Sequence, residues 1–165
     1  MSVEEFTNLV RAHGDAVRAF IFRRGLGLDP GVSDVDDIAA EVWTIAWAKH
    51  AQAPDEPDLM RAWLFQIARL TLANHIRKTV NRRSWGMSEE EIATASTESI
   101  VLADEDLKRG FAALTPGEKE VLALTVWEGL KPAEIATALN ISPNAASLRL
   151  FKARTKIAEI LMERN

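Results

Sequence analysis

Basic residues gather in one short stretch of the chain, where they could bind the phosphates of a nucleic acid. Residues 61 to 83 contain six of them and no acidic residue. The helical period places Arg69 and Arg77 on one face, with Trp63 on the same side. A tryptophan beside an arginine can stack on an unpaired base, which is worth about 1–3 kcal/mol; the alternative is that Trp63 packs against a neighbouring helix. The candidate residues for this surface are Arg61, Trp63, Arg69, Asn74, Arg77 and Lys78.

A second basic surface is predicted near the C-terminus, on the later helix of a helix-turn-helix. Pro132 begins a short helix, Asn140 suits the left-handed turn, and Ser142 caps a helix that starts at Pro143. The second helix of such a pair presents its first residues to base edges. Leu148 could meet a thymine methyl group, and the alternative is contact with a protein partner. We expect base contacts from Asn144, Ala145, Leu148 and Arg149, and phosphate contacts from Lys152, Arg154 and Lys156.

Acidic residues are concentrated in a different segment. Residues 28 to 60 carry eight of them against one lysine, Lys49, in a chain whose formal net charge is −4. Net charge and its distribution govern association rather than fold, so this asymmetry predicts two partners, one basic and one anionic. The alternative is that both charged runs are solvated faces without a partner.

The sequence offers little material for catalysis or metal binding. It has no cysteine and three histidines, which excludes disulfides and thiolate zinc sites and leaves too few clustered ligands. No nucleophile–base pair, phosphate loop or pair of inward carboxylates can be assembled, so we expect neither an enzyme nor a cofactor. Acids in SVEEF stand where a signal peptide carries Lys or Arg, and no apolar run approaches about 18 residues. The chain is therefore expected to stay in the cytoplasm without inserting into a membrane.

Helices have to position the candidate residues, because helical periodicity dominates and no segment alternates like a strand. The predicted fold is all-α. A capping box, Ser2 with Glu5, opens a first helix with an apolar face that reaches Ile21. Further helices are expected over about residues 34–49 and 59–80.

Beyond these helices, residues 84–104 are acidic, small and polar, which is typical of a linker. Four short helices are predicted after it, one of them opened by a capping box of Thr115 and Glu118. The predicted organisation is a helical domain over residues 1–83, a flexible linker over 84–104, and a helix-turn-helix domain over 105–165.

Three stretches, in this order, resemble the motifs of small bacterial RNA polymerase sigma factors of the extracytoplasmic-function (ECF) group. DVDDIAAEVWTIAW resembles the polymerase-binding helix, and MRAWLFQIARLTLANHIRK resembles the helix that recognises and melts the minus-ten promoter element. LTPGEKEVLALTVWEGLKPAEIATALNISPNAASLRLFKAR resembles the domain that reads the minus-thirty-five element. The resemblance covers nearly the whole chain. It implies two helical domains on a flexible linker and a protein that directs core polymerase to promoters.

The resemblance also implies roles for particular residues. Asp37 and Glu41 are expected to dock on the coiled-coil clamp of the polymerase β′ subunit, and the C-terminal domain on the β flap. The segment AQAPDEPDLM corresponds to the one that captures a flipped base of the minus-ten element, beside a helix that carries Arg69, Asn74 and Arg77. Family members are commonly held inactive by an anti-sigma factor, which the resemblance adds as a further partner.

This sequence departs from the family pattern at several positions. Ala40 replaces a glutamine of the clamp-binding helix, and Lys131 stands where a hydroxyl residue usually caps. Ser147, Leu148 and Phe151 replace Lys, Ser and His of the reading helix. Fewer cations then face DNA, so weaker phosphate attraction is expected from this domain, with the salt slope lower by about 0.9 for each lost contact.

Two other functions fit part of the sequence. A helix-turn-helix regulator that acts without core polymerase explains residues 105–165 but leaves the basic run over 61–83 without a role. A protein-only adaptor is the other alternative. The sigma-factor interpretation expects Arg69 and Arg77 to be exposed to solvent and to face away from Asp37 and Glu41.

Overall fold

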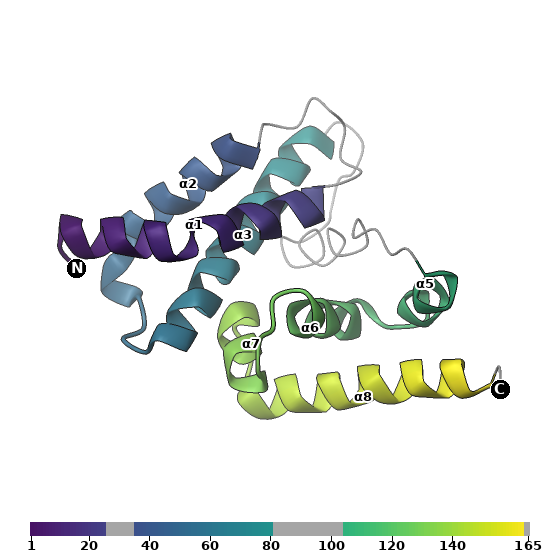
Figure 1. The fold of residues 1–165 in the computed structure, drawn as a ribbon. Coiled ribbons are helices and arrows are strands. Elements are labelled where there is room, and N and C mark those ends of the chain that lie inside the picture. Colours follow the sequence, from purple (N-terminus) through teal and green to yellow (C-terminus); the bar gives the residue numbers. More distant parts are fainter. Residues whose placement is uncertain (26–34, 81–103, 164–165) are drawn as a thin grey trace.

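The computed structural model describes residues 1–25, 35–80 and 104–163, and all the regular elements in these ranges are helices. In the N-terminal part these are α1 (Val3–Gly25), α2 (Val35–Ala48), a short 3-10 turn (His50–Gln52) and α3 (Pro57–Val80). In the C-terminal part they are α5 (Glu105–Ala112), α6 (Pro116–Val126), α7 (Pro132–Leu139) and α8 (Pro143–Met162). The predicted all-α fold of two helical domains is confirmed, although α8 is long rather than short (Figure 1).

Helix starts follow the capping signals of the sequence. Ser2 Oγ accepts from Glu5 N at 3.1 Å, and Glu5 Oε2 accepts from Ser2 N at 2.5 Å. The same reciprocal pair opens α6, between Thr115 and Glu118. These bonds satisfy backbone N–H groups that have no partner within the helix. The Gly/Pro loop before α2, nearly all of the expected linker, and Arg82 and Arg83 lie outside the described residues.

The N-terminal helices pack around an apolar centre. Phe20 of α1 stacks on Phe65 of α3 with ring centroids 5.1 Å apart, and both are fully buried. Val42 of α2 and Leu72 of α3 are fully buried as well. Each of the three helices contacts the other two, so the acidic α2 and the basic α3 are held side by side.

The two domains are in contact rather than apart. Helix α7 packs along α3, and the buried apolar residues of both domains form one contiguous cluster (Figure 1). A helix buried on one side only would show an apolar stripe facing a polar one. Helix α3 instead has buried residues almost all round between Ala62 and Ala73. None of the described helices is long and apolar enough to cross a membrane.

Candidate nucleic-acid interface

The helix-turn-helix forms as the sequence predicts. Asn140 takes the left-handed conformation with φ 52°, and α8 starts three residues later, at Pro143. Ser142 Oγ accepts from Ala145 N at 3.1 Å, which caps α8. The inner side of α8 is formed by Ala146, Leu150 and Ala153, all buried.

The outer side of α8 is open to solvent. The exposed candidate residues on it are Asn144, Leu148, Arg149, Lys152 and Arg154, and Ala145 is half-buried. Two large apolar side chains interrupt this polar face: Leu148 is 54% exposed and Phe151 is 68% exposed. A helix presented in this way has the side chains needed for base edges near its start and for phosphates farther along.

Lys156 has a partner within the protein. Its Nζ lies 2.8 Å from Oε2 of the buried Glu118. Burial opposes ionisation of Glu118, but the Lys156 ammonium and the Thr115 backbone outweigh it and hold the pKa of Glu118 below its ordinary value. In this arrangement Lys156 therefore neutralises a carboxylate instead of facing outward for a phosphate.

The second candidate surface, on α3, is largely covered. Arg69 is 2% exposed and Trp63 is 7% exposed. The expectation that Arg69 faces solvent is wrong, and Trp63 is also buried. The physical reason is the C-terminal domain, whose helix α7 packs against α3. The sequence pattern could not reveal this, because the covering residues belong to the other domain and lie far away along the chain.

The remaining candidates on α3 are partly open. Arg77 donates to Asn74 Oδ1 at 3.0 Å, both are half-buried, and Lys78 is exposed. Near the other end of the helix, Arg61 lies 3.3 Å from Oε2 of Glu134, at the start of α7. The basic residues of α3 are thus divided between solvent and the C-terminal domain.

The acidic and basic candidate residues lie close to each other rather than on opposite sides of the domain. One groove of about 560 Å³ is lined by Glu41 from α2, by Trp63 and Asn74 from α3, and by Asn140. Glu41 Oε2 lies 2.5 Å from His75 Nε2, which links α2 to α3. Asp37 is exposed on α2. The expectation that the polymerase-facing and DNA-facing sides are well separated is therefore wrong for Glu41 and Asn74.

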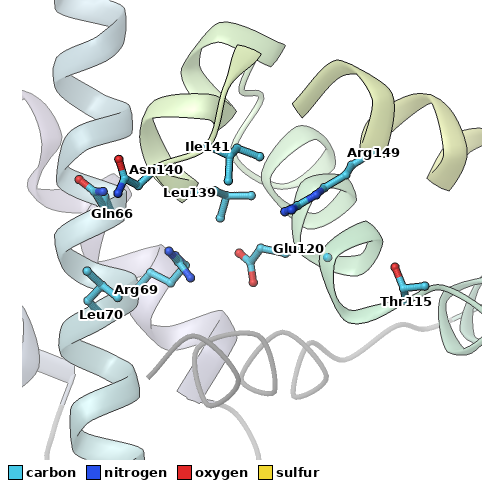
Figure 2. A pocket seen from close by; sticks show the side chains of 10 residues that line it. Gln66, Arg69, Leu70, Thr115, Glu120, Leu139, Asn140, Ile141 and Arg149 are labelled. Atoms are coloured by element: carbon cyan, nitrogen blue, oxygen red, sulfur yellow. The ribbon is translucent and has the colours of Figure 1, made fainter. Parts of the chain in front are cut away.

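A second cavity lies between the domains. It has a volume of about 640 Å³, and its lining includes Arg69, Glu120, Asn140 and Arg149. Figure 2 shows the Arg69 guanidinium and the Glu120 carboxylate directed toward each other across this space, with Arg149 directed in from α8. Cations from both candidate DNA surfaces therefore line the same cavity as one acidic residue of α6.

The segment between α2 and α3 lines a separate cavity. Its volume is about 480 Å³, and Pro54, Asp55 and Met60 face Leu9 and Ala12 of α1 across it. This is the segment that the sequence assigns to capture of a flipped base. The cavity is large enough for a base.

Four residues at the domain contact were not predicted as functional. Arg23 and Arg24 of α1 pair with Glu128 and Glu120, at N–O distances of 2.5 Å and 2.6 Å. Each pair joins side chains from different domains, so no local spacing could have indicated it. The available signal was the occurrence of acidic residues on α6 and in the turn after it, in a domain expected to bind DNA.

Comparison with known proteins assigns both domains. Residues 9–82 match the family model for sigma-70 region 2, and residues 104–157 match that for sigma-70 region 4. The chain is 30% identical to RNA polymerase sigma factor CnrH of Cupriavidus metallidurans, over 94% of this chain and 86% of that protein. It is 25% identical to the ECF RNA polymerase sigma factor SigL of Mycobacterium tuberculosis, over 94% of this chain and 90% of that protein.

Solved structures share the fold. The structure of CnrH in complex with the cytosolic domain of CnrY has a TM-score of 0.58 at 24% identity and covers 99% of this chain and 92% of that one. Sigma factor RpoE in complex with the anti-sigma factor NepR, from Bartonella quintana, has a TM-score of 0.62 at 19% identity and covers 97% and 98%. Two matched regions in the right order, with relatives aligned over nearly their full length, show that the chain belongs to the ECF group of sigma-70 factors, which bind core RNA polymerase and direct it to promoters.

Proposed function

We propose that this sigma factor reads the minus-thirty-five element with the start of α8 and the minus-ten element with α3 and the segment before it. The observation that carries the proposal is the exposed face of α8, where Asn144, Leu148 and Arg149 follow a capped helix start. An exposed apolar side chain such as Leu148 fits a thymine methyl group better than a phosphate. The cavity beside Asp55 and Met60 is the candidate pocket for a flipped base.

We propose Asp37 and Glu41 as contacts for the β′ clamp of the polymerase. Asp37 is exposed, and the Glu41 side chain is 36% exposed beside His75. Carboxylates on one face of α2 complement a basic partner, and such charges mainly raise the association rate and fix the orientation. The domain boundaries proposed for this activity are 1–83 and 105–165, with residues 84–104 as the connection.

We propose an anti-sigma factor as a further partner. The support is the similarity to two sigma-factor structures, one solved with the cytosolic domain of CnrY and one with the anti-sigma factor NepR. Sigma factors work on RNA polymerase, so the proposed location is the cytoplasm.

In vitro transcription tests the assignment. Core RNA polymerase is incubated with the purified protein and a library of randomised promoters, and the run-off products are sequenced. The expected result is RNA that starts downstream of two enriched sequence elements. A matched sample with Arg149→Ala should lose enrichment of the upstream element and keep that of the downstream one. Products no more abundant than with core polymerase alone would refute the function.

A further inference from the structure

The contact between the domains is built from opposite charges that the two domains contribute separately. The N-terminal domain supplies the cations Arg23, Arg24 and Arg61, and the C-terminal domain supplies the carboxylates. The pairs are Arg23 with Glu128 at 2.5 Å, Arg24 with Glu120 at 2.6 Å, and Arg61 with Glu134 at 3.3 Å.

The three carboxylates are buried, whereas Arg23 and Arg61 keep 28% and 35% of their side-chain surface exposed. The side chains of Arg24 and Glu120 are 2% and 3% exposed, and those of Glu128 and Glu134 are 6% each. Pairs on a solvated surface contribute little, whereas removal of one partner from a buried pair is strongly destabilising. The buried Arg24–Glu120 pair therefore favours this arrangement of the two domains over arrangements that would separate the pair.

The acidic residues occupy positions near the cations proposed for the minus-ten strand. Arg61 is paired with Glu134, and Arg69 is buried and directed toward Glu120 across the cavity between the domains (Figure 2). A phosphate group would approach the same guanidinium groups. Promoter DNA and the C-terminal domain therefore cannot occupy this side of α3 together.

The two DNA-reading surfaces differ in this respect. Asn144 and Leu148 on α8 remain exposed while Trp63 and Arg69 on α3 are covered, and Arg149 is exposed although its guanidinium is directed into the cavity between the domains. A duplex can reach the start of α8 without any movement of the domains. A separated strand can reach Trp63 and Arg69 only after α7 has left α3.

We propose that Glu120, Glu128 and Glu134 form an autoinhibitory contact that closes the minus-ten surface while leaving the minus-thirty-five surface open. The proposal rests on the assignment of α3 to the minus-ten strand made above. It has two consequences that can be separated experimentally. Loss of the contact opens the domains, and it increases affinity for single-stranded DNA more than affinity for duplex DNA.

The Arg23–Glu128 pair allows a test that leaves the proposed DNA-reading residues unchanged. The chain has no cysteine, so spin labels can be attached at Thr44→Cys on α2 and Thr155→Cys on α8, both exposed. Glu128→Arg places two like charges at the contact, and Arg23→Glu combined with Glu128→Arg restores an opposite pair. Glu159→Arg makes the same charge change at an exposed site on α8, outside the contact, and is the matched control.

Pulsed electron-electron resonance measures the distance between the two labels. The expected result is one narrow distribution for the unaltered pair and the control, a longer and broader one for Glu128→Arg, and a return toward the narrow one in the charge-swapped protein. A distribution for Glu128→Arg that matches the control refutes the contact, and run-off transcription in the same protein shows separately whether the sigma-factor assignment stands.

Fluorescence anisotropy with a single-stranded and a double-stranded promoter probe measures the second consequence. Compared with Glu159→Arg, Glu128→Arg should bind the single strand more tightly by about fivefold or more, since the closed population no longer reduces the apparent affinity. Duplex affinity should differ less than about twofold between these two variants. Equal gains for both probes would attribute the effect to added charge and would refute the autoinhibition.

Discussion

At the residue scale, one hydrogen bond ties the proposed polymerase contact to the proposed DNA-binding helix. His75 Nε2 lies 2.5 Å from Glu41 Oε2, and both side chains are partly buried. The bond limits the positions that the Glu41 carboxylate can take, so His75 is a positioning residue for it.

His75→Ala should lower the free energy of unfolding by about 1 kcal/mol, because a hydrogen bond between α2 and α3 is lost. It should also weaken binding to core polymerase by about twofold to tenfold, since the freed carboxylate has more rotamers to lose on docking. Urea denaturation and a fluorescence binding titration measure the two effects. In a Glu41→Gln background the substitution at His75 should no longer change polymerase affinity, and an undiminished effect there would exclude a positioning role.

His13 provides a pH dependence in the N-terminal domain. Burial, and then the nearby Arg61, lower the pKa of the His13 imidazole. The folded protein therefore resists a proton that the unfolded chain accepts, so stability is fully present above the unfolded pKa of about 6.5 and declines as the pH falls through it. The depressed pKa of the Glu118 carboxyl acts in a lower and separate pH range.

His13→Gln should reduce the loss of stability between pH 7.5 and pH 5.5. Urea midpoints of the variant and the unaltered protein at the two pH values measure it. A loss of equal size in the His13→Gln variant and in the unaltered protein would show that another group titrates in this range. His50→Gln, in the 3-10 turn after α2, is the control.

At the element scale, α7 lacks a capping side chain. Lys131 occupies the N-cap position with an extended backbone but makes no side-chain capping bond, while Glu134 Oε1 accepts from Lys131 N at 3.3 Å. Lys131→Ser adds the missing half of a capping box, so it should raise the free energy of unfolding by about 1 kcal/mol. Chemical denaturation measures this. Lys131→Ala removes the same charge without adding a cap, and an equal gain in that variant would contradict the explanation.

The reading helix α8 has fewer cations than the family pattern. Ser147 is exposed near its start, at a position where that pattern places a lysine. Ser147→Lys should add one phosphate contact and steepen the dependence of log affinity on log salt by about 0.9. Anisotropy of a duplex promoter probe across a salt series tests it. Thr7→Lys, an equal charge change at an exposed position of α1, should leave the slope unchanged, and equal slopes for the two variants would contradict the prediction.

The elements were largely predictable from the sequence because their signals are local. Ser2, Thr115 and Ser142 fix helix starts through bonds to residues three positions on, and Asn140 fixes the turn before α8. The exposure of Arg69 was not predictable. A helical period identifies two faces, but it cannot show that a second domain covers the polar one.

At the scale of the whole molecule, the buried pair of Arg24 and Glu120 couples the stability of the two domains. Glu120→Leu leaves a buried guanidinium without this carboxylate and should cost about 3–5 kcal/mol. Arg24→Met combined with Glu120→Leu should recover most of that loss, because two apolar side chains of similar volume carry no desolvation penalty when they are buried. Calorimetric scans measure both proteins. A double variant no more stable than Glu120→Leu would place the importance of Arg24 in its contact with the Phe20 ring, 4.3 Å from the guanidinium carbon.

The packing of α7 on α3 also bears on promoter architecture. When that packing is lost, the two domains are joined only through residues 81–103, and a chain of that length spans at most about 80 Å when fully extended. The length of this stretch then limits the distance between the two promoter elements that one molecule can bind. Promoters whose elements lie farther apart are rejected, however well each element matches. Shortening this stretch should make the protein prefer closer elements without altering which bases it reads.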